Sequence, residues 1–138
     1  MNNLNPDPLV ELRNLTKTFG TGESATQVLK GLNLTVQRGG MIALLGASGS
    51  GKSTLLNILG TLLRPTSGDF RMLGQDLFEA NDTTLTDFRN RHIGFVFQFH
   101  NLLPDFTALE NVIFPSAVRD GIETQQAHRR GAELLDIV

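Results

Sequence analysis

The chain has 138 residues, about the length of one domain, and its 40% hydrophobic and 19% charged residues are ordinary for a soluble globular protein. Its formal net charge of -2 offers no basic surface for nucleic acid, and the absence of cysteine excludes disulfides, thiolate catalysis and thiolate metal sites. The first residues carry no secretory signal and no stretch is apolar over enough length to span a membrane, so we expect a cytoplasmic protein.

After an N-terminal tail of residues 1–8, the first part of the chain has the pattern of paired strands. Residues 9–20 alternate apolar and polar side chains, a glycine-rich turn follows at 20–24, and the alternation resumes over 28–40. This pattern predicts an antiparallel ribbon with one buried face. Residues 41–45, MIALL, are continuously apolar, which predicts a strand covered on both faces, as in the middle of a parallel sheet.

A helix is predicted directly after a loop at residues 46–54. Its apolar residues recur at helical spacing, and Pro65 together with Gly68 is expected to stop it. These apolar residues are Leu55, Leu56, Ile58, Leu59, Leu62 and Leu63. The sequence therefore predicts a strand, a glycine-rich loop and a helix in succession.

Shorter elements are predicted next. Residues 67–74 are typical of a short strand and turn, residues 82–92 of a brief helix capped by Asp82 or Thr83, and residues 93–98, IGFVFQ, of another strand. The chain contains no internal repeat, low-complexity tract or linker between domains.

Two more helices are predicted in the last part of the chain. Thr107 and Glu110 have the spacing of a capping box that starts a helix over 108–114, which Pro115 is expected to interrupt. A final helix is expected to begin at Thr124. Its apolar face consists of Ala127, Gly131, Leu134, Leu135 and Val138.

The loop at 46–54 matches the pattern G-x-x-x-x-G-K-[ST]. Glycines allow positive φ, so that successive backbone N–H groups surround an anion at the start of the following helix. The Lys52 ammonium adds a full positive charge, and the Ser53 hydroxyl is a hard oxygen suited to Mg²⁺. A Gly/Ser turn before a chance lysine is the alternative, but the strand before the loop and the helix after it favour phosphate binding. The predicted contacts are Gly46, Ala47, Ser48, Gly49, Ser50, Gly51, Lys52, Ser53 and Thr54.

Motifs beyond this loop carry a family resemblance. TKTFG lies ahead of the loop, PTSGD follows the loop helix, and FVFQ ends in a glutamine. With these motifs the chain resembles the ATP-binding subunit of an ABC transporter over residues 9–138. GASGSGKSTLLNILG and IGFVFQFHNLLPDFTALENV further resemble the lipoprotein-releasing and macrolide-export branch. The resemblance implies an α/β P-loop NTPase fold of the ABC ATPase type with an antiparallel β-subdomain, covered here only up to a point before the signature motif and the Walker B strand.

The resemblance also implies roles for individual residues, with ATP and Mg²⁺ as cofactors. Phe19 would stack on adenine where the family usually has tyrosine; the alternative is a core phenylalanine on a strand. Gln98 would meet Mg²⁺, together with Ser53, and the attacking water, although a lone glutamine is usually a surface amide. Gly40 replaces a glutamate that is frequent in the family, which we interpret as tolerated variation. Glu110 is explained by the capping box rather than as a general base.

The segment after Gln98 is expected to contact a partner, because it is apolar and contains a proline. The implied partners are transmembrane permease subunits and a second copy of the ATP-binding subunit, at the inner face of the cell membrane; no nucleic-acid partner is expected. The candidate contacts are Phe99, His100, Leu102, Leu103, Pro104 and Phe106. Half of these side chains could equally be ordinary core. We interpret the three histidines as solvated or packed residues rather than as metal ligands.

The machinery for hydrolysis is incomplete in these residues. Mg²⁺ in such enzymes normally rests on an aspartate that ends a second apolar strand. Residues 132–138, AELLDIV, are the nearest candidate, but Glu133 breaks the apolar run and the periodicity is helical. The LSGGQ signature, the acidic pair and the switch histidine of the family are also missing. We therefore expect the chain by itself to bind MgATP weakly, not to turn it over, and to be poorly soluble or molten, because 41–45 would form an exposed apolar sheet edge.

The leading hypothesis is ATP binding, and hydrolysis in the complete protein, to drive export through an ABC transporter. The alternative is a non-catalytic fragment that binds nucleotide or docks on a membrane subunit. A small P-loop kinase or GTPase is disfavoured because no guanine-reading Asn-Lys-x-Asp motif occurs. The identity of the transported substrate is not encoded in these residues.

Overall fold

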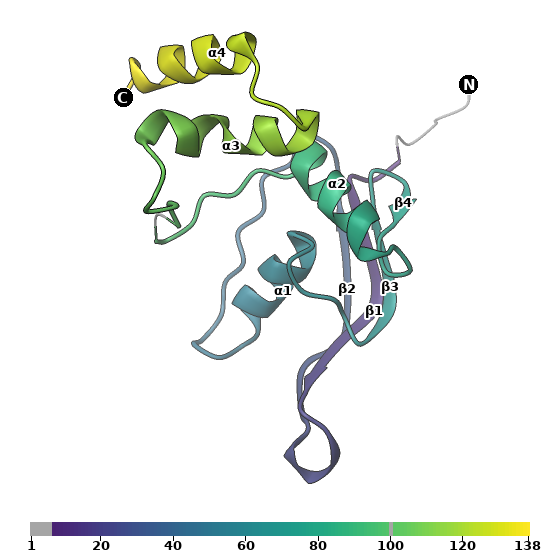
Figure 1. Ribbon diagram of the computed structural model, residues 1–138. Helices are drawn as coiled ribbons and strands as arrows, with labels where there is room; N and C mark the ends of the chain where they lie inside the picture. The colour runs from purple at the N-terminus through teal and green to yellow at the C-terminus, as the bar shows by residue number, and fades with distance from the viewer. Residues whose placement is uncertain (1–6, 100) are drawn as a thin grey trace, which may run out of the picture. The chain divides into compact units, whose positions relative to one another are not determined.

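The computed structural model describes residues 7–99 and 101–138 (Figure 1). The chain divides into two compact units, which are described separately below. The first unit ends at Leu85, and the second spans Thr86–Val138. The first unit holds a sheet, one α-helix and the first residues of a second α-helix, and the regular structure of the second unit is helical.

One antiparallel sheet, with strand order β2-β1-β3-β4, forms the base of the first unit (Figure 1). Its strands are β1 (Val10–Phe19), β2 (Thr26–Val36), β3 (Ser67–Met72) and β4 (Gln75–Asp76). A short 3-10 helix at Gly22–Ser24 joins β1 to β2. The predicted ribbon and the predicted strand and turn at 67–74 are therefore confirmed.

Alternate residues of these strands point inward and form the core of the first unit. At Asn14, β1 bulges: the residue has φ 48°, and its backbone N–H donates to Asn33 Oδ1 at 2.9 Å. The extra residue lets Leu12 and Leu15 both point inward, with exposed fractions of 1% and 0%. Each such fully buried side chain stabilises the fold by about 1.5–3 kcal/mol.

Helix α1 (Lys52–Leu59) is shorter than predicted. Leu55 and Ile58 are buried and fix its apolar face, as expected. The helix ends at Gly60 rather than near Pro65, because Thr61 takes a positive φ of 56° and turns the chain out of the helix. The prediction that the helix runs past Leu62 and Leu63 is wrong: both backbone N–H groups donate to the Asn57 carbonyl oxygen, at 2.8 and 3.1 Å.

Two apolar segments that were predicted as strands are irregular. Residues 41–45 and 93–98 belong to no strand, and among the described residues only β1 to β4 pair into a sheet. Met41 is 99% exposed and Val96 is fully exposed. A strand covered on both faces needs a neighbouring ladder for its N–H and C=O groups, and no described residue supplies one. Both segments therefore expose apolar surface, as expected for 41–45, and the poor solubility that should follow remains a prediction.

Helix α2 (Asp82–His92) confirms the predicted brief helix but not its cap. The Asn81 side chain, not Asp82 or Thr83, accepts from the backbone N–H of Thr84, at 2.8 Å. Asparagine is among the best residues at this position because its short side chain reaches the free N–H groups of the first turn.

Helix α3 (Ala108–Asp120) begins with the predicted capping box. Glu110 N–H donates to Thr107 Oγ1 at 3.3 Å, and Thr107 N–H donates to Glu110 Oε2 at 2.7 Å. The predicted interruption at Pro115 is wrong, since the helix continues to Asp120. Pro115 lacks an N–H and so removes one helical bond, but Asn90 Nδ2 donates to its carbonyl at 2.9 Å and supports this turn.

Helix α4 (Gln125–Leu135) packs against α3 through Gly131, which is buried. A Cβ at this position would lie 2.7 Å from Ile113 Cγ2 and 2.8 Å from Leu109 Cδ1. Glycine therefore permits the close approach of the two helices. The predicted helix start at Thr124 is confirmed, whereas Val138 lies beyond the helix end and is fully exposed.

The capping box makes α3 sensitive to acid. Hydrogen bonds from the Thr107 hydroxyl and backbone, with a smaller effect of His128, hold the pKa of Glu110 below its usual 4.5. A lowered folded-state pKa contributes stability above the unfolded value that disappears as pH falls through the folded value. We expect helicity, measured by far-UV circular dichroism, to fall below about pH 4.5, and Glu110→Gln to flatten this dependence.

A control is needed because the pKa of a second carboxylate is lowered as well. The hydrogen bond from Arg119 lowers the pKa of Asp120. Asp120→Asn should therefore remove its own share of the pH dependence and leave the share of the capping box intact. An acid profile that is unchanged in Glu110→Gln would contradict the assignment.

Candidate phosphate-binding site

The loop before α1 has the backbone geometry of an anion cradle. Three glycines take positive φ: Gly46 at 155°, Gly49 at 77° and Gly51 at 90°. Gly51 is the N-cap of α1, and a Cβ there would lie 3.1 Å from side-chain carbons of both Val28 and Leu29. Glycine at this position suits both the positive φ and the close contact of the start of α1 with β2.

Lys52 is the first residue of α1, and its ammonium lies over the loop. Its Nζ donates to the carbonyl oxygens of Ala47 and Gly46, at 2.6 and 2.9 Å, and lies 3.3 Å from Ser50 Oγ. The loop itself is closed by a bond from Ser50 N–H to the Ala47 carbonyl, at 3.3 Å. A full positive charge therefore lies where free N–H groups of the first helical turn begin.

A cavity of about 400 Å³ opens beside this loop. It is lined by Val28, Ser48, Gly49, Gly51, Lys52, Ser53 and Thr54. Six of the nine predicted contacts line it, and the other three, Gly46, Ala47 and Ser50, contact the Lys52 ammonium instead. Glycine N–H groups, one ammonium and hydroxyls form a donor set that fits a phosphate, and the Ser53 hydroxyl, on an exposed residue, is a suitable oxygen for Mg²⁺.

Val28 lines this cavity but was not predicted as a site residue. The only relevant pattern was the alternation of β2, which marks its neighbour Leu29 as a core residue. Nothing in the local sequence shows that β2 passes beside the loop, so this contact requires the fold.

Phe19 ends β1 in the same unit and is 42% exposed, so it is not an ordinary core phenylalanine. Its ring lies 5.0 Å from Lys17 Nζ, within the range of a cation–π contact. The same Nζ donates to the Arg64 carbonyl at 2.9 Å, which fixes the Lys17 side chain. Phe19 does not line the cavity beside the loop, and its role with adenine remains a prediction.

Gln98 and the predicted partner contacts belong to the second unit. Gln98 is exposed in an irregular segment, and its predicted role at Mg²⁺ remains a prediction. The exposed fractions are 73% for Phe99, 66% for Leu102, 37% for Leu103 and 41% for Phe106. Pro104 is also exposed, and His100 lies outside the described residues. These apolar side chains are therefore accessible rather than core.

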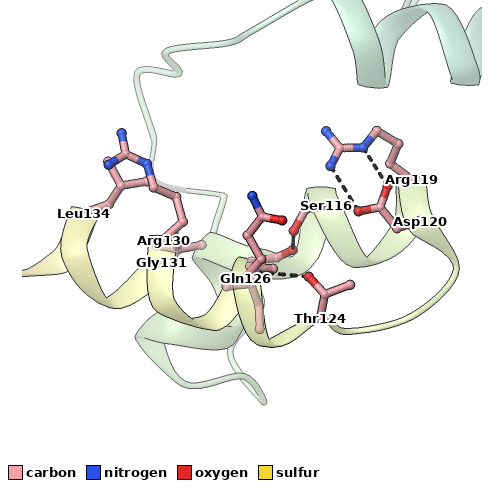
Figure 2. A pocket seen from close by; sticks show the side chains of 11 residues that line it. Ser116, Arg119, Asp120, Thr124, Gln126, Arg130, Gly131 and Leu134 are labelled. Atoms are coloured by element: carbon pink, nitrogen blue, oxygen red, sulfur yellow. Dashed lines mark hydrogen bonds and ion pairs between the residues drawn. The ribbon is translucent and has the colours of Figure 1, made fainter.

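A second cavity, of about 360 Å³, lies between α3 and α4 (Figure 2). Figure 2 shows the Arg119 guanidinium turned onto Asp120, with bonds of 2.8 and 3.0 Å. Arg130, also on this rim, donates to Glu133 at 3.1 Å. The charges around this cavity pair with neighbours on the same helix, and no sequence motif predicted it.

In the part of the chain that the structure describes, no helix is long and apolar enough to cross a membrane. No three His, Cys, Asp or Glu side chains in residues 7–99 and 101–138 gather closely enough to hold a metal ion.

Known proteins resemble this chain over most of its length. A family model described as ABC transporter matches residues 29–137. The lipoprotein-releasing system ATP-binding protein LolD 2 of Rhodospirillum rubrum is 59% identical over 128 residues, which cover 93% of this chain and 55% of that protein. The corresponding LolD protein of Geobacter metallireducens is 57% identical over 127 residues, covering 92% and 56%. The chain spans about half the length of these curated relatives.

A solved structure is similar as well. The dimeric, post-hydrolysis form of the ATP-binding cassette MJ0796, bound to ADP and Pi, matches with a TM-score of 0.83 and 41% identity. The match covers 92% of this chain and 56% of that one. In each comparison the match therefore covers little more than half of the known protein.

Proposed function

The chain belongs to the ABC transporter family, and from that membership we propose that it is the nucleotide-binding part of an ATP-binding subunit of the lipoprotein-releasing type. The predicted ABC ATPase fold class is confirmed by the match to MJ0796. In domain terms, residues 9–138 form a partial ATP-binding domain behind a short N-terminal tail. In the complete protein, ATP hydrolysis drives export of a substrate from the membrane.

The observation that best supports ATP binding is the arrangement of the loop at 46–54. Three glycines with positive φ, the start of α1 and the Lys52 ammonium converge beside one cavity. In this proposal Lys52 contacts the β and γ phosphates, and the backbone N–H groups of the loop surround them. The Ser53 hydroxyl would hold Mg²⁺, which would offset the negative charge of the phosphates. From the family membership we also propose that Gln98 would contact Mg²⁺ and orient the attacking water. Bound MgATP supplies the phosphoryl group whose hydrolysis provides the free energy.

Partners follow from the same family membership. We propose that the exposed apolar segment after Gln98 docks on transmembrane permease subunits at the cytoplasmic face of the inner membrane. A second copy of the ATP-binding subunit completes the site, in line with the dimeric state named for MJ0796. Stimulation of ATP turnover in the complete protein by its membrane subunits distinguishes this proposal from a non-catalytic docking fragment.

Phe19 provides the test of adenine recognition. Stacking of a base on an aromatic ring is worth about 1–3 kcal/mol, so Phe19→Ala should weaken MgATP binding by about 5- to 150-fold. Phe19→Tyr keeps the ring and should bind as wild type. Saturation-transfer NMR, which suits weak ligands, measures the affinity for ATP. Phosphorus NMR line broadening measures the affinity for inorganic triphosphate, a probe that lacks a base and has no carbon-bound protons.

The pattern of results decides between base and phosphate recognition. Phe19→Ala should leave triphosphate binding unchanged, because that probe has no ring to stack. Phe114→Ala, which removes a similarly exposed phenylalanine from α3, is the matched control and should have no effect on either probe. Equal ATP affinities of wild type and Phe19→Ala would contradict the proposed adenine contact.

A further inference from the structure

The side-chain amide of Asn111, in the first turn of α3, binds the loop that precedes the helix. Its Oδ1 accepts from the backbone N–H of Leu103 at 2.8 Å, and its Nδ2 donates to the Leu103 carbonyl at 3.1 Å. Nδ2 also lies 3.1 Å from the Phe106 carbonyl and 3.0 Å from the Thr107 carbonyl. One amide thus meets one N–H group and three carbonyl groups, which also settles the orientation of its oxygen and nitrogen.

These bonds tie the backbone of the loop at residues 101–107 to α3 at Leu103, Phe106 and Thr107. Asn111 pairs with both polar groups of Leu103, as a neighbouring strand would. The turn around Pro104 is closed by a bond from Phe106 N–H to the Leu103 carbonyl, at 3.2 Å. The Phe106 ring packs edge-on against Phe114 of α3, with 5.6 Å between ring centroids. A loop of this kind is ordinarily mobile, but this one is tied to α3 at several points.

The fixed loop presents apolar side chains to solvent. Leu102 is 66% exposed, Phe106 is 41% exposed and Leu103 is 37% exposed. Asparagine is a poorer helix former than alanine, so residue 111 does not favour α3 itself. The hydrogen bonds of its side chain stabilise the loop instead. A loop that is already ordered loses less conformational entropy when a partner binds.

We propose that Asn111 is the positioning residue of the partner-docking loop 101–107. It holds the loop in the form that receives an amphipathic, apolar-faced helix of a transmembrane permease subunit. This inference rests on the docking proposed above and adds the residue on which the shape of the docking surface depends. Asn111 contacts the partner only through the loop that it holds.

The effect of the Asn111 hydrogen bonds on the loop can be measured without a partner. In wild type, hydrogen exchange should be slowed at the Leu103 and Phe106 amides. Asn111→Ala should speed exchange at both, while amides in the second half of α3 keep their protection. Asn111→Asp conserves volume and can still accept from the Leu103 N–H, but it sets a carboxylate oxygen against the three carbonyl groups that Nδ2 now meets. This repulsion should displace the loop and speed exchange at the Phe106 amide. Unchanged exchange at Phe106 in both variants would overturn the proposal.

Partner binding is measured with the membrane subunits of the lipoprotein-releasing system of Rhodospirillum rubrum in nanodiscs. We expect Asn111→Ala and Asn111→Asp to weaken binding by about 10- to 100-fold, because the loop must then be ordered on docking. Asn90→Ala is the matched control: it removes a bond to Pro115 of α3 but none to the loop, and it should change stability without changing partner affinity. MgATP binding should be the same in all four proteins.

Each outcome separates this inference from the proposed function. Faster exchange at Leu103 with unchanged partner affinity would overturn the positioning role and leave the docking proposal standing. Failure of the wild-type chain to bind the membrane subunits would overturn the docking proposal, and the inference with it, even if the exchange pattern appears as expected. Equal losses of partner affinity in Asn90→Ala and Asn111→Ala would assign the effect to stability alone.

Discussion

Replacing Lys52 by alanine should weaken MgATP binding by about 10- to 150-fold, or about 1.5–3 kcal/mol. The ammonium lies over the loop, 2.6 Å from the Ala47 carbonyl and 2.9 Å from the Gly46 carbonyl, at the first residue of α1. A phosphate bound by the loop would exchange these neutral acceptors for charged ones, and hydrogen bonds between charged groups are about twice as strong as neutral ones. The loss of this contact should therefore dominate the affinity.

Lys52→Ala needs two controls, one for the loss of the ammonium group alone and one for the loss of a lysine outside the site. Lys52→Met keeps the aliphatic length of the side chain and should lose as much affinity as Lys52→Ala, because only the ammonium matters. Lys30→Ala removes an exposed lysine from β2, away from the lining of the cavity, and should bind as wild type. Saturation-transfer NMR measures all four proteins. Wild-type affinity in both Lys52 variants would refute the role of this residue.

Gly68→Ala should lower the free energy of unfolding of the first unit by on the order of 3 kcal/mol. Gly68 has φ +98°, and a Cβ there would lie 2.5 Å from the Asn14 carbonyl oxygen and 2.7 Å from the Arg13 carbonyl oxygen. Backbone atoms cannot move aside as the end of a side chain can. The substitution therefore combines a strained conformation with separation of β3 from the bulge in β1.

Gly74→Ala is the matched control for conformation alone. Gly74 has a similar positive φ of +77°, but a Cβ added there would meet no heavy atom within 4 Å. We expect a loss of about 1 kcal/mol there. Hydrogen exchange of the β1 amides reports the opening free energy of this unit. Equal effects of the two substitutions would show that the close approach at Gly68 does not matter.

Local sequence signals predicted the elements that depend on neighbouring residues. The capping box at Thr107 and Glu110, the ribbon at the N-terminal side and the glycine-rich loop all form as expected. In each case the bonds that define the element lie within a few residues or within one hairpin. The loop geometry was predictable because a positive φ at Gly49 and Gly51 follows from residue type and spacing.

Features that depend on distant residues were not predictable from local patterns. The run at 41–45 has the composition of a strand, but a strand exists only where a second strand pairs with it. Pro115 breaks isolated helices, yet here Asn90, from another helix, donates to its carbonyl group. The hydrogen bond between Asn111 and Leu103 was likewise not predictable, because an asparagine within a helix does not indicate which loop its side chain will contact.

Phosphate binding by the loop is tested most directly by hydrogen exchange of residues 46–54 with and without MgATP. If this loop is the phosphate cradle, exchange of its amides should slow on addition of MgATP in the wild-type chain, and Lys52→Ala should need a higher concentration for the same effect. Amides of α4 in the second unit should not change. Saturating MgATP that leaves exchange at 46–54 unaltered, or slows it no more than in α4, would contradict the assignment.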